Sequence, residues 1–261
     1  RETMGYPRFL GLQGKGQLRV FYGESMEEAL DTAHCETLDI LDIDQANPTD
    51  LVFEQSKAYR YLYVLTTGDL RYSKLDMLYE YSPVTYKGSF RCNDDLLNKI
   101  WEVGAYTMHL TTRELFIDGI KRDRWAWSGD ASQSYLMNYY LFNDNPTVQR
   151  TMQYLRGKDP VTSHLNTIMD YTMYWFISLY DYYQYTGDKD FIALMYPRMV
   201  SLMDYVLGRR NDRGLLEGQA GDWVFIDWAD GYLEKKGEVS FEQLLFCRSL
   251  ETMDLCADLL E

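Results

Sequence analysis

The alternation of apolar and polar residues changes its period along the chain. Before about residue 90, apolar residues recur at every second position, in residues 17–23 and 59–65. Residues 77–86 have the composition of a further strand, in which Pro83 marks an edge or a strand end. From residue 94 onward, apolar residues recur at steps of three and four. The pattern therefore predicts a strand-rich first part and a helical second part.

Helices are predicted at 94–113, 130–142, 146–156, 171–185, 189–209 and 240–261. The first, third and fifth carry a single apolar stripe, whereas the second and fourth are apolar on most faces. Because a helix that is apolar on all sides must be buried on all sides, this alternation predicts inner helices surrounded by outer ones. Such a double layer is an α/α toroid, and six helices are about half of a ring of six hairpins.

We therefore predict a mainly α fold, namely half of an (α/α)6 toroid preceded by β-sandwich strands. Residues 1–88 would be the C-terminal part of the sandwich, and 89–261 the N-terminal half of the toroid. The chain opens at Arg1 and ends at Glu261 within a continuing helical pattern. We interpret it as a piece of a longer polypeptide.

The charge of the chain excludes two classes of partner. The 261 residues include 40 acidic and 26 basic ones, for a net charge of −14. Nucleic-acid backbones and anionic membranes both attract basic proteins, so neither is an expected partner. The longest apolar stretch, around residues 171–180, is too short and too polar to cross a bilayer. Self-association as a homo-oligomer stays open.

Metal and cofactor patterns do not occur. The four cysteines form no C-x-x-C pair, the three histidines are far apart, and no H-E-x-x-H occurs. The acidic stretch of Asp39, Asp42, Asp44 and Asp50 lacks the glycine and glutamate of a calcium loop, so a solvated loop or edge is favoured. We expect no metal and no organic cofactor, and we leave disulfide pairing open.

Residues 116–130 combine carboxylates, cations and indoles. The carboxylates are Asp118, Asp123 and Asp130, and they alternate with three cations and two tryptophans. Carboxylates supply acid, base and hydroxyl-binding groups for glycoside cleavage, and indole faces stack on sugar rings. The alternative is an ion-paired loop in which Lys121, Arg122 and Arg124 neutralise Asp118 and Asp123.

Residues 221–231 form a second cluster of the same kind, just before a predicted inner helix. We interpret it as the wall of a sugar subsite, with Trp223 or Trp228 stacking on a ring and Asp222 or Asp227 binding hydroxyls. The alternative is a loop held by buried tryptophans. In a toroid the two loops would lie on the same rim.

The order Asp118-x-x-x-Arg122-Asp123-x-x-x-Trp127-x-Gly129-Asp130 resembles the active-site signature of the bacterial α-L-rhamnosidases, glycoside hydrolase family 78. The flanking segments 88–94, 168–171 and 186–188 also fit. The resemblance covers residues 80–261 well and the strand region loosely. The Gly221-Asp222-Trp223 loop is similar to a Gly-Asp-Trp loop of the same family.

The resemblance implies a role for each matched residue. Asp123 matches the general acid, Asp118 and Asp130 match carboxylates that bind sugar hydroxyls, and Trp127 matches the aromatic residue of the signature. It further implies cleavage of terminal α-L-rhamnosides with inversion, using a downstream glutamate as the general base. That base would lie beyond Glu261, so these 261 residues alone should be inactive.

The match departs from the family at the acid, where Asp123 stands in place of the usual glutamate. The shorter side chain withdraws the carboxyl by roughly 1 Å, which can cost on the order of 10²-fold in rate. Adjacent cations would also lower the pKa of a carboxyl that must hold its proton. Arg122 and Arg124 must therefore point elsewhere, or burial must dominate.

Three other functions stay open. One is a non-catalytic carbohydrate-binding protein on the same scaffold, and another is a toroid hydrolase or lyase for a different sugar such as a uronic acid. The third is a structural helical-repeat protein. Export to the periplasm or the extracellular space is favoured over a cytoplasmic location.

Overall fold

The computed structural model describes residues 1–228, 231 and 234–261, and these residues form two compact units. The first unit comprises Arg1–Pro83 together with Gly119–Arg124, and the second comprises Val84–Asp118 together with Trp125–Glu261. The boundary predicted from the sequence lies after residue 88. Each unit is described below by itself.

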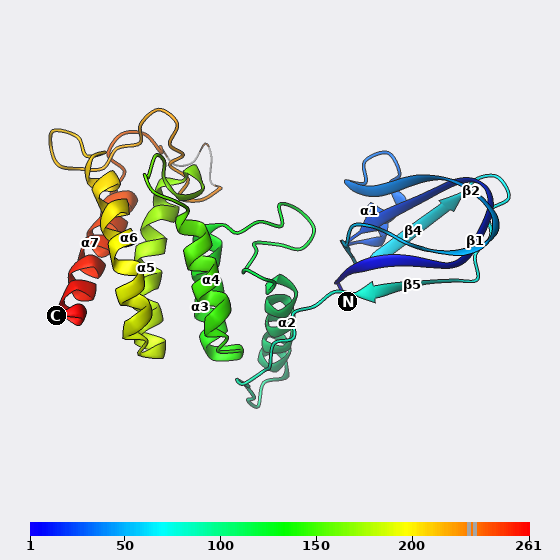
Figure 1. Cartoon of the computed structure of the whole chain (residues 1–261), viewed down its shortest axis with the longest axis horizontal. Coiled ribbons are helices and arrows are strands. Elements are labelled where there is room, and N and C mark those ends of the chain that lie inside the picture. The colour runs from blue at the N-terminus through cyan, green and yellow to red at the C-terminus, as the bar shows by residue number, and fades with distance from the viewer. Residues whose placement is uncertain (229–230, 232–233) are drawn as a thin grey trace. The chain divides into compact units, whose positions relative to one another are not determined.

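The first unit, which we call the sheet unit, is an antiparallel sheet built on one long strand. Its strands are β1 (Thr3–Gly23), β2 (Thr37–Val52), β3 (Lys57–Tyr59), β4 (Tyr61–Thr66) and β5 (Lys74–Tyr79). The first strand pairs with all four others (Figure 1). The core on this sheet includes Phe9, Leu18, Val20 and Tyr22. The strand predicted at 17–23 lies within β1, whereas the one predicted at 77–86 ends at Tyr79, before Pro83.

Glycines let β1 bend and let a neighbouring turn approach it. Gly11 and Gly14 have φ angles of 62° and 107°, in the left-handed region, where the register with β2 shifts. A Cβ atom on Gly16 would lie 1.9 Å from the carbonyl oxygen of Thr67. These glycines therefore serve strand geometry.

The acidic stretch forms β2, an edge strand of the sheet. Asp39 accepts a hydrogen bond from the Tyr22 hydroxyl at 2.8 Å, and Asp44 pairs with Lys15 at 2.7 Å. These aspartates are used across strands, as the predicted edge requires. Over the described part of the chain, no group of three His, Cys, Asp or Glu side chains is arranged to hold a metal ion.

The second unit, which we call the helical unit, contains the six predicted helices. They are α2 (Asp95–Thr111), α3 (Ser128–Leu141), α4 (Asn145–Arg156), α5 (Met169–Thr186), α6 (Lys189–Leu207) and α7 (Ser240–Leu260). Each begins and ends within two residues of its prediction. Asp94 caps α2 by accepting from the backbone of Leu96 and Leu97, and Asp144 is the residue that precedes α4. Two short elements were not predicted, α1 (Met26–Leu30) in the sheet unit and a 3-10 turn, Leu165–Thr167.

Within the helical unit, α5 packs between α3 and α7, while α4 packs against α5 and α6 (Figure 1). Of the two helices predicted to be apolar on most faces, α5 is the centre of the core, with Trp175, Phe176 and Leu179 fully buried. The other, α3, is buried on one side only, since Met137 and Tyr140 are exposed. The apolar stripe of α2 is only partly covered, because Met108 is 2% exposed but Ile100 is 58% exposed.

Neither the cysteines nor the described helices add a disulfide or a membrane span to this fold. All four cysteines are free, so no disulfide crosslinks them. The described helices include none that combines the length and the apolar character of a bilayer-spanning segment.

Candidate functional site

The two loops singled out in the sequence are joined through one segment, the 3-10 turn before α5. Asn166, in the left-handed region at φ 53°, accepts a hydrogen bond from the backbone of Ser128 at 2.9 Å. The backbone N–H of Trp223 donates to the carbonyl oxygen of Thr167 at 2.9 Å. Since this turn bonds to the start of α3 on one side and to the 222–228 loop on the other, both loops lie at the same end of the helices.

Tyr171, in the first turn of α5, touches side chains from both loops. Its hydroxyl donates to Oδ2 of Asp130 at 2.9 Å. Its ring meets Trp127 edge-on at a centroid distance of 6.4 Å, and Phe225 at 5.7 Å. Burial, followed by the charge of Asp130, raises the pKa of Tyr171, so its hydroxyl stays a hydrogen-bond donor at neutral pH.

Gly129 is required beneath this tyrosine. A Cβ atom at Gly129 would lie 2.3 Å from Cε1 of the Tyr171 ring. The glycine of the signature therefore allows the first turn of α3 to lie against the tyrosine ring.

Asp118 and Trp125 close the neck of the 118–130 loop. The backbone N–H of Asp118 donates to the carbonyl oxygen of Trp125 at 3.0 Å. The backbone N–H of Trp125 donates to Oδ1 of Asp118 at 2.9 Å. Asp118 is half-buried, and its charge also contributes to the raised pKa of Tyr171. Asp118, Asp130 and Tyr171 are thus electrostatic neighbours in the helical unit.

The three cations of the loop bind groups of the sheet unit. Lys121 forms an ion pair with Glu28, and its side chain is only 4% exposed. Arg122 donates to Glu36 at 2.6 Å and also lies 3.6 Å from Glu24.

Arg124 completes this set by donating to the carbonyl and hydroxyl oxygens of Ser56, both at 2.9 Å. The ion-paired-loop alternative, in which these cations neutralise Asp118 and Asp123, is therefore wrong as to their partners. Arg122 and Arg124 thus point away from Asp123, as its predicted role as an acid requires.

Asp123 itself belongs to the sheet unit through the 119–124 segment. It is exposed, and both Asp123 and Arg124 adopt positive φ angles, 51° and 53°. Such angles are uncommon for residues other than glycine and require support from the surrounding contacts. The bonds of Lys121, Arg122 and Arg124 supply that support.

Three aromatic residues of the second loop, Trp223, Phe225 and Trp228, form what we call the aromatic cluster. Their ring centroids lie 5.1–5.8 Å apart, and the rings meet edge to face. Trp223 is 41% exposed and Trp228 is 76% exposed. The alternative of a loop held by buried tryptophans is therefore wrong for Trp228, and an indole face remains open to a ligand. Ala229 and Asp230, also in the predicted cluster, lie outside the described residues.

The two aspartates of this loop differ sharply. Asp222 accepts from Arg209 with both oxygens, at 2.7 Å and 2.7–3.1 Å, and its side chain is 4% exposed. Its predicted role in binding hydroxyls is corrected here to a structural one, because the buried pair occupies both oxygens. Asp227 is exposed, with Lys235 at 3.8 Å, and remains a candidate for binding sugar.

Two further carboxyls are buried beside the site: Asp170, which belongs to the 168–171 segment matched in the sequence, and Glu242, which the sequence analysis missed. Asp170 is 1% exposed and Glu242 is fully buried, in the first turns of α5 and α7. Burial, followed by the charge of Asp170 and a hydrogen bond to it, raises the pKa of Glu242 to about 8. Asp170 accepts from the backbone N–H of Phe225 at 3.3 Å. An acidic residue in a first helical turn is so common that Glu242 gave no signal in the sequence.

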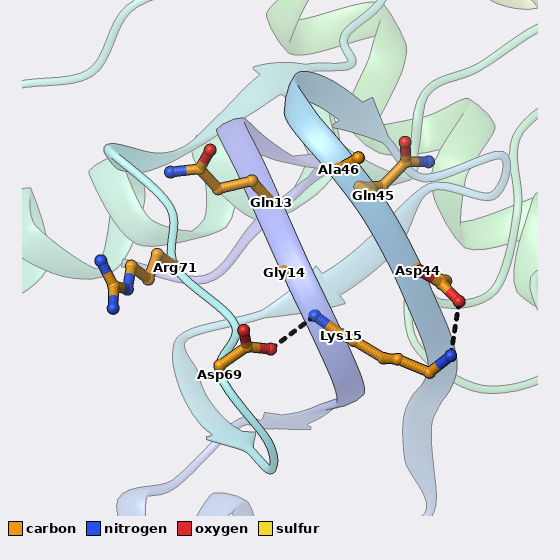
Figure 2. A pocket seen from close by; sticks show the side chains of 8 residues that line it. All are labelled: Gln13, Gly14, Lys15, Asp44, Gln45, Ala46, Asp69 and Arg71. Carbon is orange, nitrogen blue, oxygen red and sulfur yellow. Dashed lines mark hydrogen bonds and ion pairs between the residues drawn. The ribbon is translucent and has the colours of Figure 1, made fainter.

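A separate polar hollow of about 450 Å³ lies on the sheet unit (Figure 2). Its lining includes Lys15, Asp44, Asp69 and Arg71. Lys15 uses its ammonium on Asp44 and its backbone N–H on Asp69, as the dashed lines in Figure 2 show. Its lysine is already paired and no aromatic face lines it, so the loop site of the helical unit remains the better candidate.

Comparison with known proteins gives a consistent result. The family model for the bacterial alpha-L-rhamnosidase 6 hairpin glycosidase domain matches residues 85–261. A second, described as alpha-rhamnosidase-like, bacteroidetes, N-terminal, matches residues 1–64. An alpha-L-rhamnosidase of Formosa agariphila is 24% identical over 163 residues, which are 54% of this chain and 17% of that protein.

Solved structures show the same fold. The GH78 family rhamnosidase of Bacillus sp. GL1 matches 99% of this chain and 28% of its own, with a TM-score of 0.87 and 24% identity. The rhamnosidase from Klebsiella oxytoca with rhamnose bound matches all of this chain and 56% of its own, with a TM-score of 0.81 and 21% identity. The chain thus spans between about a sixth and about half of these relatives.

Proposed function

Because the chain belongs to the bacterial alpha-L-rhamnosidase six-hairpin glycosidase family, we propose that its natural protein removes terminal α-L-rhamnose from a glycan or glycoside. The observation that carries the proposal is the meeting of the two loops at Tyr171. That meeting gathers Asp118, Asp130 and the aromatic cluster at one end of the helices. Carboxylates beside exposed indole faces are the groups that bind sugar hydroxyls and sugar rings.

The proposed fold follows from the same packing. We infer that the helical unit is half of an (α/α)6 toroid, with α3, α5 and α7 as inner helices. The exposed apolar residues at its two edges support this, namely Leu96 and Ile100 on α2 and Leu244 on α7. Further helix pairs would cover them. We also infer that the sheet unit is part of a β-sandwich, because Ile40 on β2 and Leu78 on β5 are exposed and a second sheet would cover them.

The proposed chemistry is inversion by general acid and base. Asp123 is the proposed acid, which protonates the departing glycosidic oxygen while water attacks the anomeric carbon from the other face. Asp118 and Asp130 would hold the ring hydroxyls, with Trp127, Trp223 or Trp228 against the sugar and Asp227 at the rim. An inverting pair is separated by roughly 6.5–9.5 Å, which leaves room for the water. We assign the base to a part of the natural protein outside these 261 residues, and we invoke no metal or organic cofactor.

The test of this proposal compares leaving groups. In the protein at its natural length, Asp123→Asn should lower kcat on alkyl α-L-rhamnosides by about 10²–10⁴-fold, the usual range for a general acid. It should affect an activated nitrophenyl rhamnoside far less, because that leaving group needs no proton. Glu251→Gln, at an exposed ion pair with Arg248 on α7, is the control. Equal turnover by Asp123→Asn and the unchanged protein on both substrates would refute the role of Asp123.

The stereochemical part has its own measurement. Proton NMR of the first-formed product should show the β-anomer of rhamnose from an α-rhamnoside. Release of the α-anomer would contradict inversion while leaving hydrolysis intact.

One alternative function has an observation in its favour. Aspartate in place of glutamate at position 123 shortens the proposed acid, which suits a protein that binds carbohydrate without cleaving it. Tight binding of rhamnosides with no turnover, and no gain of turnover in Asp123→Glu, would support that alternative.

A further inference from the structure

Two carboxyl groups lie buried against each other beneath the aromatic cluster. Asp170 in α5 is 1% exposed and Glu242 in α7 is fully buried. Within the described residues, neither oxygen of Glu242 and only one oxygen of Asp170 has a hydrogen-bond partner when both groups are treated as acceptors. Glu242 nevertheless lies within hydrogen-bonding reach of Asp170. Two carboxyl oxygens can bond to each other only if one of them carries a proton.

The surroundings assign that proton to Glu242. Burial raises the pKa of Asp170 above its ordinary value, but Asp170 accepts from the backbone N–H of Phe225 and has Lys235 as a nearby cation, and both of these favour its charged form. Glu242 has burial and the charge of Asp170 against its ionisation. Among the residues that the structure describes, the other titratable groups that face the pair are Tyr171 and Tyr174 of α5, which are neutral donors at neutral pH.

The pair also tolerates one negative charge better than two. Asp170 and Glu242 lie in the first turns of two packed helices, whose N-terminal ends carry partial positive charge. One carboxylate is stabilised by these ends, by Phe225 and by Lys235. A second carboxylate in the same buried space would meet strong like-charge repulsion.

The bond from Asp170 leads directly to the aromatic cluster. Phe225 bonds to Asp170 through its backbone, and its ring lies 5.2 Å from that of Trp223 and 5.1 Å from that of Trp228. Ile226, the next residue, is held at a φ of 59°, which needs support from its neighbours. The orientation of the exposed indoles therefore depends on the carboxyl pair.

We propose that Asp170 and Glu242 are a positioning pair that shares one proton and holds the aromatic cluster in its sugar-binding orientation. The role in sugar binding rests on the proposed function, whereas the shared proton does not. Neither residue touches substrate in this proposal. Loss of the proton at alkaline pH creates a second charge, weakens the Phe225 contact and releases the indoles.

The experiment follows the indoles without any sugar. Near-ultraviolet circular dichroism and tryptophan fluorescence are recorded from about pH 6 to about pH 10, a range that spans the pKa of about 8 to which burial raises Glu242. The unchanged protein should show a transition near that pH. Glu242→Gln, which keeps a donor but cannot titrate, should lose it. Glu251→Gln, at an exposed ion pair with Arg248 on the same helix, should keep it. A transition that persists in Glu242→Gln, or is absent from the unchanged protein, would overturn the shared proton.

A second variant guards against misfolding of the first. Asp170→Asn removes the neighbouring charge, so the transition of Glu242 should move to lower pH. An unchanged midpoint in this variant would equally contradict the pairing.

Binding of free rhamnose separates this inference from the proposed function. Affinity of the unchanged protein should fall by about three- to tenfold across the transition, the worth of one hydrogen bond, and Glu242→Gln should bind equally at both ends. A transition with no rhamnose binding at any pH would refute the proposed function and leave the shared proton standing. Rhamnose binding that ignores the transition would refute the positioning role alone.

Discussion

The hydroxyl of Tyr171 donates a 2.9 Å hydrogen bond to Asp130 and so links the first turns of α5 and α3. This single bond connects a carboxylate of the first loop to a residue that also touches Phe225 of the second. The candidate site is therefore organised from α5, and both loops depend on it.

Removing that bond should weaken sugar binding more than folding. Tyr171→Phe keeps the ring contacts but leaves Asp130 without its donor, so we expect about three- to tenfold lower affinity for rhamnose. Calorimetric titration would measure it. Tyr140→Phe is the control, because Tyr140 lies on α3 with an exposed hydroxyl bond to Tyr185. Equal affinities in the two variants would contradict a role for Tyr171 in binding.

Two glycine substitutions should move stability in opposite directions. Gly129→Ala directs a Cβ atom into the Tyr171 ring and should lower the midpoint of thermal unfolding. Gly104→Ala, in α2 with nothing within 4 Å of the new atom, should stabilise by about 0.5–1 kcal/mol because alanine favours helix. Chemical denaturation of both variants tests these two predictions. Stabilisation by Gly129→Ala would show that the Tyr171 ring moves aside at little cost.

Substitution of Asp222 should lower the stability of the protein, whereas substitution of Asp227 should not. Asp222→Asn leaves Arg209 without its partner in a buried place, and the free energy of unfolding should fall by about 3 kcal/mol. Asp227→Asn is exposed and should change it by less than about 0.5 kcal/mol. Urea unfolding monitored by fluorescence measures both, and a stable Asp222→Asn would restore Asp222 to the sugar-binding set.

The ion pair between Lys121 and Glu28 should hold the segment that carries Asp123. Lys121→Met should increase cleavage of residues 119–124 by a protease, because the uncovered Glu28 no longer fixes the segment. In the natural-length protein it should also lower kcat. Lys15→Met, which breaks an exposed pair with Asp44, should alter neither. If residues 119–124 of Lys121→Met resist the protease as well as those of the unchanged protein, Arg122 and Arg124 alone are enough to hold the segment.

Buried His164 should make the protein sensitive to acid. Its side chain is 2% exposed, and burial lowers its pKa to about 4, with Asp222 opposing and Arg209 adding to that shift. Below about pH 6.5 His164 is protonated in the unfolded chain but stays neutral in the folded chain. The free energy of unfolding therefore falls as the pH drops from about 6.5 to about 4. The loss is about 3 kcal/mol for a shift of this size.

Glu242 changes the stability with pH in the opposite direction to His164. Its folded pKa of about 8 lies above its ordinary value, so its contribution is present at low pH and is lost as the pH rises to about 8. The His164 prediction is therefore tested as a difference between the unchanged protein and His164→Gln. Parallel curves of unfolding free energy against pH would contradict it.

The helices were predictable because their signals are local. Asp94 and Asp188 cap helices by bonding to backbone N–H groups two or three residues ahead, and the apolar faces follow at helical spacing. The short helix Met26–Leu30 has too few residues for a periodic pattern, and the strand predicted at 77–86 extends too far, because β5 ends at Tyr79.

The site was predictable only in part. The signature residues from Asp118 to Asp130 stand close together in sequence, and the tryptophans of the second loop were exposed as expected. Asp222 could not be separated from Asp227, because the partner that buries it, Arg209, is thirteen residues away. Asn166 and Glu242 gave no usable signal, since their roles depend on which elements the fold brings beside them.

Because the sheet unit includes residues 119–124 as well as residues 1–83, truncation of the chain at one position cannot separate it from the helical unit. Excision of the first 83 residues would strip Lys121, Arg122 and Arg124 of Glu24, Glu28, Glu36 and Ser56. An engineer who grafts a foreign sheet onto the helices must carry those four positions across, or redesign the six-residue insert with it.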